Sequence, residues 1–207
     1  MDFSRNLSAL FPGAHSIVLQ ELLRTPKQVT GRQLAMQLVD RLGKSRVSEV
    51  LQDLVRQGLV EREILGAAHL YSINKKHLCY DLLNSLTQPV DLLLDLVTKQ
   101  IGRWSPKPIA VVLFGSIAKG TAKPDSDIDL LIVRPRTVSE DDDAWQDQLF
   151  RLTLAVQKAT GSELNYLDYS QAELTRMAKS GARLAKELSQ SGLVAFGKLD
   201  LQFAKAG

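Results

Sequence analysis

The sequence predicts an α+β protein made of two domains, and three observations lead to this prediction. Residues 14–57 contain three successive runs in which apolar side chains recur at helical spacing. Residues 59–74 alternate in the manner of a β-hairpin. From residue 106 onwards, short β-branched runs alternate with helical patterns, as is typical of a sheet flanked by helices.

Composition narrows the class of protein. The 207 residues are 44% hydrophobic and 24% charged, which is ordinary for globular domains. No run approaches the roughly 18 apolar residues that span a bilayer, so we expect no membrane partner and a cytoplasmic location. Cys79 is the single cysteine and lacks zinc-finger neighbours. The net charge is +3, and residues 1–86 hold the whole surplus, with 11 basic against 8 acidic residues.

Three helices are expected in the first domain. The first covers residues 14–24, and the second begins near Thr30, whose hydroxyl can cap it. The third covers residues 45–57 and ends at Gly58. The inward face of the second helix is expected to carry four apolar side chains: Leu34, Ala35, Leu38 and Val39.

A hairpin is expected next, with residues 59–65 and 69–74 paired across a turn at residues 66–68. The stretch from GRQLAMQLVD to HLYSIN resembles the winged helix-turn-helix of bacterial and archaeal regulators, which implies such a domain over residues 1–76. In that family the third helix enters the major groove and the wing lies along the backbone. By this resemblance, the residues facing nucleic acid, which is DNA in this family, would be Lys44, Ser45, Arg46, Ser48, Glu49, Gln52, Arg62 and His69.

An alternative for the same helices is a module that binds protein or dimerises without touching nucleic acid. Glu49 and Asp53 favour it, because carboxylates repel phosphates. Residues 77–104 are expected to form a helical linker, interrupted at Gln88-Pro89, that joins the domains or serves as a homodimer seam.

The second domain carries the residues that suggest chemistry. PKPIAVVLF reads as a buried strand that ends at Gly115-Ser116, and DSDIDLLIV reads as a second strand. Alternation places Asp127 and Asp129 on one face, where two like charges are costly unless a cation lies between them. A Gly-Ser pair at a strand-to-helix junction allows backbone N–H groups and a hydroxyl to approach a phosphate.

The segment VLFGSIAKGTAKPDSDIDLLIV resembles the signature of the DNA polymerase beta-like nucleotidyltransferase superfamily, especially its minimal bacterial and archaeal members. The resemblance covers residues 106–197 and implies a domain over 105–207 with a mixed sheet flanked by helices. It also implies that Asp127 and Asp129 bind Mg²⁺ (or Mn²⁺), which bridges a nucleoside triphosphate, while Gly115 and Ser116 hold the outer phosphates. Lys119 and Lys123 could add phosphate contacts or simply be solvated loop lysines.

Active members of that superfamily use a third carboxylate on a later strand. Here that strand is SELNYLDYS, and Asn165 falls at the third acidic position. An amide coordinates weakly and cannot act as a base. Glu163, on the same face as Asn165, could substitute, and so could Asp168 if a bulge turned it from the opposite face. A helix broken near Gly181 and a last strand over residues 192–197 should follow.

Two functions therefore stay open at this stage. The first is transfer of a nucleoside monophosphate from a magnesium-bound triphosphate to an unidentified hydroxyl, with the winged helix contacting nucleic acid. The second is a DNA-binding transcriptional regulator whose nucleotidyltransferase domain is catalytically degenerate and only binds nucleotide or mediates assembly. In either function a homodimer or a partner protein could complete the site.

Overall fold

The computed structural model describes residues 6–180 and 182–199, which divide into two compact units between residues 89 and 90. The segment predicted as a linker is shared between them. Helix α5 (Tyr80–Leu86) belongs to the N-terminal unit, whereas α6 (Pro89–Ile101) buries Leu93, Val97 and Ile101 in the core of the C-terminal unit. No helix in the described ranges is long and apolar enough to cross a membrane.

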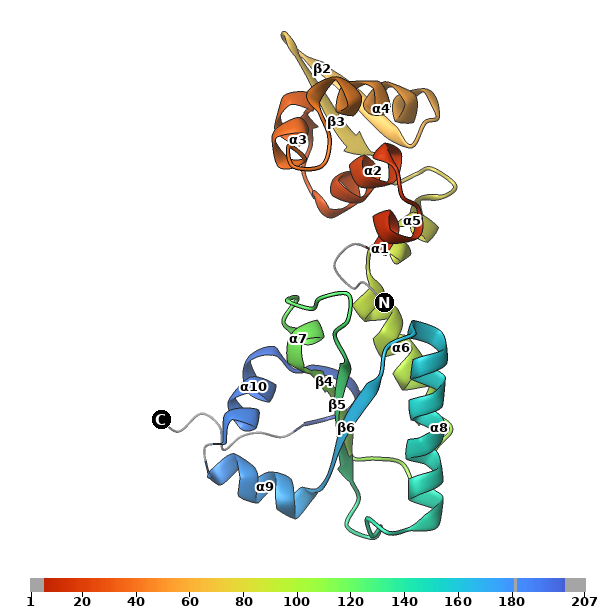
Figure 1. The fold of residues 1–207 in the computed structure, drawn as a ribbon, viewed down its shortest axis with the longest axis vertical. Helices are drawn as coiled ribbons and strands as arrows, with labels where there is room; N and C mark the ends of the chain where they lie inside the picture. Colours follow the sequence, from red (N-terminus) through yellow and green to blue (C-terminus); the bar gives the residue numbers. More distant parts are fainter. Residues whose placement is uncertain (1–5, 181, 200–207) are drawn as a thin grey trace. The chain divides into compact units, whose positions relative to one another are not determined.

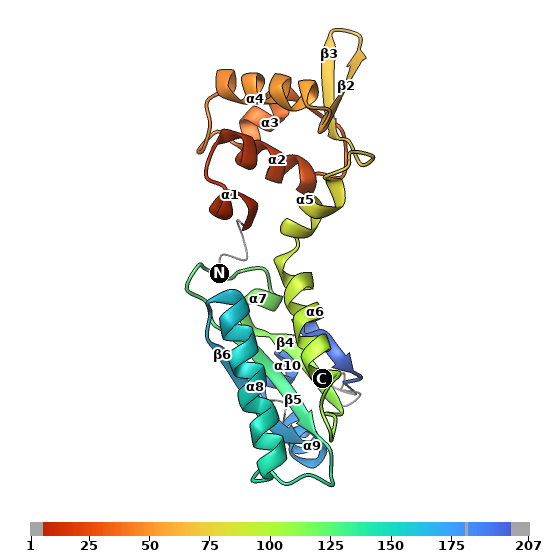
Figure 2. The same cartoon turned by 90° about the vertical axis from the view of Figure 1, so that its right-hand side faces the viewer.

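The N-terminal unit combines short helices with a small antiparallel sheet (Figures 1 and 2). Its sheet has the strand order β1-β3-β2, and its core is formed mainly by apolar side chains of α2, α3 and α4. The elements are α1 (Asn6–Leu10), α2 (Ala14–Arg24), β1 (Val29–Thr30), α3 (Gly31–Gln37), α4 (Lys44–Arg56), β2 (Val60–Leu65) and β3 (Ala68–Ile73).

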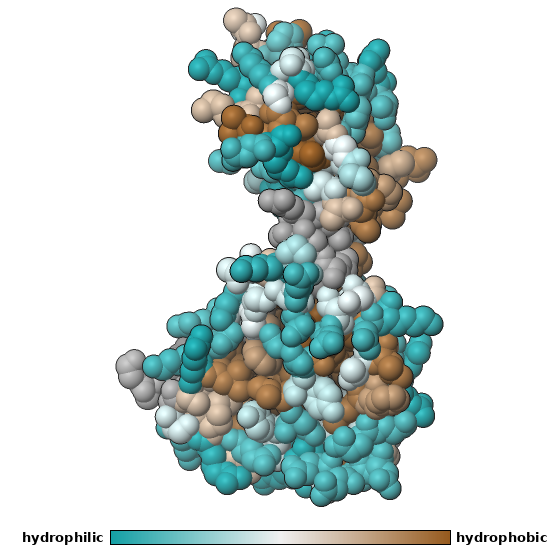
Figure 3. All heavy atoms as spheres, in the orientation of Figure 1, coloured by the Kyte–Doolittle hydropathy of each residue, from teal (hydrophilic) through white to brown (hydrophobic). Residues whose placement is uncertain are grey.

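Local sequence signals explain most of these boundaries. Thr30 caps α3 in a capping box with Gln33, as its position predicts. The β2–β3 hairpin turns through Gly66, whose φ of 59° suits glycine, and Ala68 lies in β3 rather than in the turn. The prediction for Val39 is wrong: α3 ends at Gln37, so Val39 lies in the following turn and is 69% exposed. Figure 3 shows a hydrophobic patch over α3, where Met36 is exposed as well.

The C-terminal unit is a four-stranded mixed sheet with helices on both faces (Figure 1). The strand order is β6-β5-β4-β7; β5 and β6 are parallel and the other pairs are antiparallel. Its elements after α6 are β4 (Ala110–Phe114), α7 (Gly115–Ala118), β5 (Ile128–Arg134), α8 (Asp143–Thr160), β6 (Leu164–Ser170), α9 (Gln171–Lys179), α10 (Arg183–Ser191) and β7 (Leu193–Gly197).

Strand β5 separates two hydrophobic layers. Its even-numbered residues, such as Leu130, pack in the layer that includes α6 and α8, where Trp104 and Trp145 meet edge to face with ring centroids 5.2 Å apart. Its odd-numbered residues, such as Leu131, pack in the layer that includes α9 and α10. This alternation directs the side chain of Asp129 to the α10 side of the sheet.

Candidate functional site

Gly115 and Asp129 are brought together by the pairing of β4 with β5. The antiparallel register places Phe114 opposite Asp129, so the chain turns into α7 directly beside the carboxylate. Gly115 has a φ of 76°, and a Cβ at this position would lie 3.1 Å from Cγ of Asp129 and overlap its Oδ2. Glycine is therefore required at residue 115 both for its backbone conformation and for the space that the Asp129 carboxylate occupies.

Asn165 connects the two aspartates. The parallel register of β5 and β6 places it opposite Asp129, and its Nδ2 donates a hydrogen bond of 3.2 Å to Oδ2 of Asp127. Burial raises the pKa of Asp129, and the nearby charges of Asp127 and Glu187 raise it further, while a hydrogen bond from Asn165 acts in the opposite direction. The amide thus lowers the cost of holding two carboxylates close together.

The two aspartates fit a divalent cation that receives further ligands from outside the chain. Over the described ranges, neither Asp127 nor Asp129 has an ion pair with a basic residue. Residues 6–180 and 182–199 contain no group of three His, Cys, Asp or Glu side chains placed to hold a metal. Mg²⁺ is commonly held by one or two carboxylates together with substrate phosphates and water. The carboxylates of Asp127 and Asp129, beside the turn at Gly115, meet that requirement.

The residues predicted to bind phosphate occupy different environments. Ser116 is half-buried in the first turn of α7, and its hydroxyl has no hydrogen-bond partner in the part of the chain that the structure describes. Lys119 is engaged, since its Nζ lies 2.7 Å from Oε1 of Glu187 on α10. Lys123 is exposed, and its backbone forms a turn with Ser126 through hydrogen bonds of 2.8 and 3.0 Å.

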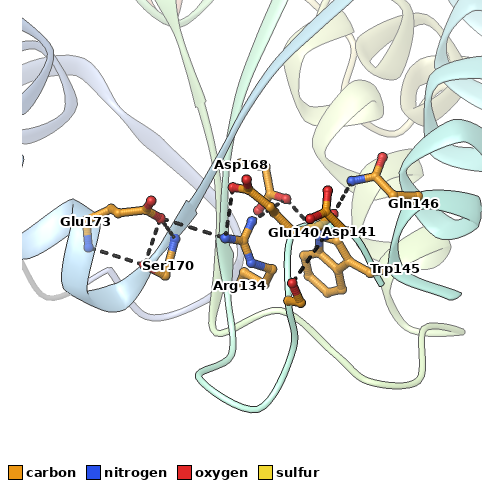
Figure 4. Close-up of polar contacts among 9 residues, drawn as sticks. Arg134, Glu140, Asp141, Trp145, Gln146, Asp168, Ser170 and Glu173 are labelled. Atoms are coloured by element: carbon orange, nitrogen blue, oxygen red, sulfur yellow. Dashed lines mark hydrogen bonds and ion pairs between the residues drawn. The ribbon is translucent and has the colours of Figure 1, made fainter. Parts of the chain in front are cut away.

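Asp168 does not replace the third carboxylate. No bulge interrupts the pairing of β5 with β6, so Asp168 lies on the face opposite to Asn165. Its Oδ2 lies 2.6 Å from Nη1 of Arg134 and accepts a hydrogen bond of 2.9 Å from Nε1 of Trp145 (Figure 4). The second substitute, Glu163, lies just before β6 with an exposed side chain, and its backbone carbonyl accepts a hydrogen bond from the backbone N–H of Ile128.

Arg134 is the centre of a buried charge network that sequence reasoning missed. The Arg134 side chain is 5% exposed, and its Nη2 lies 3.7 Å from a carboxylate oxygen of Glu140 and of Glu173 (Figure 4). Its Nε is buried without a hydrogen-bond partner among the described residues. The available signal was a basic residue at the end of the apolar run Leu130–Val133. The network accounts for Asp168 as a structural residue.

Glu187 is the second charged residue that the sequence did not reveal. It lies on α10 between buried positions, and its side chain is only 17% exposed. The one signal for it was an acidic residue directly before the buried Leu188 in an amphipathic helix. No sequence rule relates that position to Lys119, which is 68 residues earlier in the chain.

The N-terminal unit contains a basic hollow beside α4. Its volume is about 400 Å³, and its lining includes Arg32, Lys44, Ser48, His69 and Tyr71, with no acidic residue. Three other residues predicted to face nucleic acid are exposed: Ser45, Gln52 and Arg62. Arg46 forms an ion pair of 2.8 Å with Glu49, which was predicted to face nucleic acid as well.

Comparison with known proteins supports the C-terminal assignment. Residues 94–188 match the family model described as Nucleotidyltransferase domain. No curated protein matches the chain. The N-terminal unit lies outside the matched residues.

Several solved structures are similar to this chain. One is a toxin–antitoxin with AMP-PNP, at 23% identity and a TM-score of 0.38, covering 54% of this chain and 80% of that one. Another is a mutant of the toxin–antitoxin MntA-HpeT, at 22% identity and a TM-score of 0.36, covering 55% and 79%. A third, from Sulfolobus solfataricus, is described as a candidate nucleotidyltransferase, at 18% identity and a TM-score of 0.32, covering 50% and 79%. Identities and TM-scores this low say nothing about the substrate of this chain.

Proposed function

We propose that the C-terminal unit transfers a nucleoside monophosphate from a magnesium- or manganese-bound nucleoside triphosphate to a hydroxyl acceptor. One observation carries the proposal: Asp127 and Asp129 lie together beside the turn at Gly115, and neither has a basic partner among the described residues. Both lie within the residues that match the nucleotidyltransferase family. Paired carboxylates next to a glycine turn are the groups that a cation-bound polyphosphate requires.

Each residue would have a distinct role in this reaction. Asp127 and Asp129 would hold the cation, and the backbone at Gly115 with the hydroxyl of Ser116 would hold the outer phosphates. As the acceptor hydroxyl attacks the α-phosphorus and pyrophosphate leaves, a bound divalent cation would stabilise the negative charge on the phosphate oxygens. Asn165 cannot accept a proton, so the proton of the acceptor hydroxyl would pass to solvent or to a carboxylate.

Label transfer from nucleoside triphosphates tests this proposal. Wild-type protein is incubated with labelled triphosphates, Mg²⁺ or Mn²⁺ and cell lysate, beside Asp127→Ala and Asp129→Ala. Asp125→Ala is the matched control, because Asp125 is an exposed carboxylate in the same loop. We expect labelled product from the wild type and from Asp125→Ala only. Equal labelling by all four proteins, or by none, would refute the proposal.

We also propose that the N-terminal unit is a winged helix that contacts nucleic acid through α4 and the β2–β3 hairpin. The acid-free hollow lined by Arg32 and Lys44 supports this, because phosphates bind where positive charge is clustered. Fluorescence anisotropy with labelled DNA and RNA duplexes at several salt concentrations is the test. Binding that is undetectable even at low salt would refute it.

A second candidate function is favoured by Asn165. With an amide where a third carboxylate would be expected, the C-terminal unit would bind nucleotide without turnover and regulate nucleic-acid binding by the N-terminal unit. The distinguishing result is a change in nucleic-acid affinity on adding triphosphate, with no labelled product. Labelled product that depends on Asp127 would reject this candidate.

A further inference from the structure

The amine of Lys119 is already occupied by a carboxylate of the chain itself. Its Nζ lies 2.7 Å from Oε1 of Glu187, and helices α7 and α10 contact each other at this point. Glu187 is also one of the charges that raise the pKa of Asp129, so it lies close to the proposed cation site. A phosphate that approaches the Lys119 amine therefore meets the like charge of Glu187 and competes with it for this amine.

We propose that Glu187 is an internal competitor that holds Lys119 until a polyphosphate displaces it. This inference rests on the proposed function, because it concerns the phosphate subsite of the same site. Glu187 acts through Lys119 and is therefore a positioning residue. In the resting protein it sets how much of the affinity of Lys119 for phosphate is available.

Burial decides which partner moves. Glu187 is 17% exposed on a helix anchored by the buried side chains of Ala185 and Leu188, whereas Lys119 is 40% exposed. The lysine side chain has four rotatable carbons, so it can swing towards a ligand while Glu187 stays in place. Polyphosphate binding therefore exchanges one ion pair of Lys119 for another.

The local charges explain why such a competitor is useful. Without ligand, Asp127, Asp129 and Glu187 oppose the single positive charge of Lys119. Pairing Lys119 with Glu187 lowers the repulsion that Asp129 would otherwise experience from an unpaired Glu187. Asp127 and Asp129 would be neutralised by a bound divalent cation, and Lys119 could then turn from Glu187 to the phosphate.

Calorimetric titration with inorganic tripolyphosphate, with and without Mg²⁺, tests the competition directly. The proteins are the full-length wild type, Glu187→Gln, Lys119→Met and the double variant. We expect Glu187→Gln to bind about two- to fivefold more tightly, the range that partly exposed ion pairs support. Lys119→Met should bind more weakly, and Glu187→Gln should add little to it. Asp147→Asn is the matched control, since it breaks an ion pair of 2.8 Å with Arg151 on α8 and should bind as the wild type does.

Four results would overturn the inference. Unchanged or weaker binding by Glu187→Gln would mean that Glu187 does not compete for Lys119. An equal gain in the Lys119→Met background would mean that Glu187 acts through its charge alone. Failure of both wild type and Glu187→Gln to bind tripolyphosphate would overturn the proposed function as well. If the wild type binds and Glu187→Gln binds no more tightly, only the inference about Glu187 fails. Normal binding of tripolyphosphate by Lys119→Met would show that Lys119 does not bind phosphate. This last test holds even if Glu187→Gln does not fold.

Discussion

Replacement of Gly115 by alanine isolates the contact that forms the proposed site. Gly115 has a φ of 76°, and an added Cβ would lie 3.1 Å from Cγ of Asp129 and overlap its Oδ2. Gly120 offers a matched control, since its φ is 70° but nothing lies within 4 Å of an added Cβ. The two alanine variants therefore share the backbone penalty and differ in the collision with Asp129.

The expected magnitudes follow from these two terms. A non-glycine residue in the left-handed region costs about 1 kcal/mol, which applies to both variants. Moving the Asp129 side chain away from its preferred rotamer adds about 1 kcal/mol to Gly115→Ala alone. We therefore expect losses in free energy of unfolding of about 1 kcal/mol for Gly120→Ala and about 2 kcal/mol for Gly115→Ala.

Tryptophan fluorescence during guanidinium unfolding measures these losses without a label. Trp104 and Trp145 are the two tryptophans of the chain, and both lie in the core of the C-terminal unit, so the signal reports that unit. Mn²⁺ binding is measured in parallel, and Gly115→Ala should lose it while Gly120→Ala keeps it. The reasoning is refuted if the two variants are equally stable and Gly115→Ala binds Mn²⁺ as the wild type does.

Four further predictions concern charges. Asp168→Asn should lower the free energy of unfolding by about 3 kcal/mol, because it leaves Arg134 buried without its closest carboxylate; no loss in guanidinium unfolding would contradict this. Asp129 has a raised pKa, so without metal the folded state binds a proton more readily than the unfolded state does. The free energy of unfolding should therefore fall as pH rises from the ordinary carboxyl range through that raised pKa. Asp129→Asn should abolish this slope in unfolding measured between pH 4 and 7, and it should be more stable than the wild type at pH 7. Asn165→Asp should destabilise the metal-free protein and increase the thermal stabilisation by Mn²⁺, and an unchanged shift in Tm would reject the third-ligand position. Lys44→Ala should weaken binding to nucleic acids of any sequence and reduce the salt slope by about one, measured by anisotropy.

Local signals were sufficient for the arrangement around the proposed site. The β-branched run before Gly115 predicts β4, and period-two alternation predicts that Asp129 in β5 and Asp127, just before β5, project to one face. Both predictions depend only on neighbouring residues. The position of Asn165 followed from the resemblance to the nucleotidyltransferase superfamily, and the uninterrupted parallel register places it opposite Asp129.

Contacts between distant helices and strands could not be predicted in this way. The pairing of Lys119 with Glu187 depends on how α10 packs against α7, and the burial of Asp168 depends on Arg134 at the far end of β5. Val39 was assigned to the core because its spacing continues the helical pattern, but α3 ends two residues earlier. Periodicity does not specify where a helix stops when no strong terminator follows.

The amide at residue 165 changes how the proposed site can assemble. Its Nδ2 donates to Asp127, and Asn165 is paired with Asp129 in the strand register, so the amide lowers the repulsion between the two carboxylates when no cation is bound. A carboxylate there would provide a stronger cation ligand but would add a third like charge to a site where Asp129 already has a raised pKa. Asn165 thus helps to hold Asp127 and Asp129 close together, but it leaves the metal with one carboxylate ligand fewer. A cation with so few protein ligands must obtain the rest from phosphate and water, so we infer that it binds more tightly in the presence of nucleotide than alone.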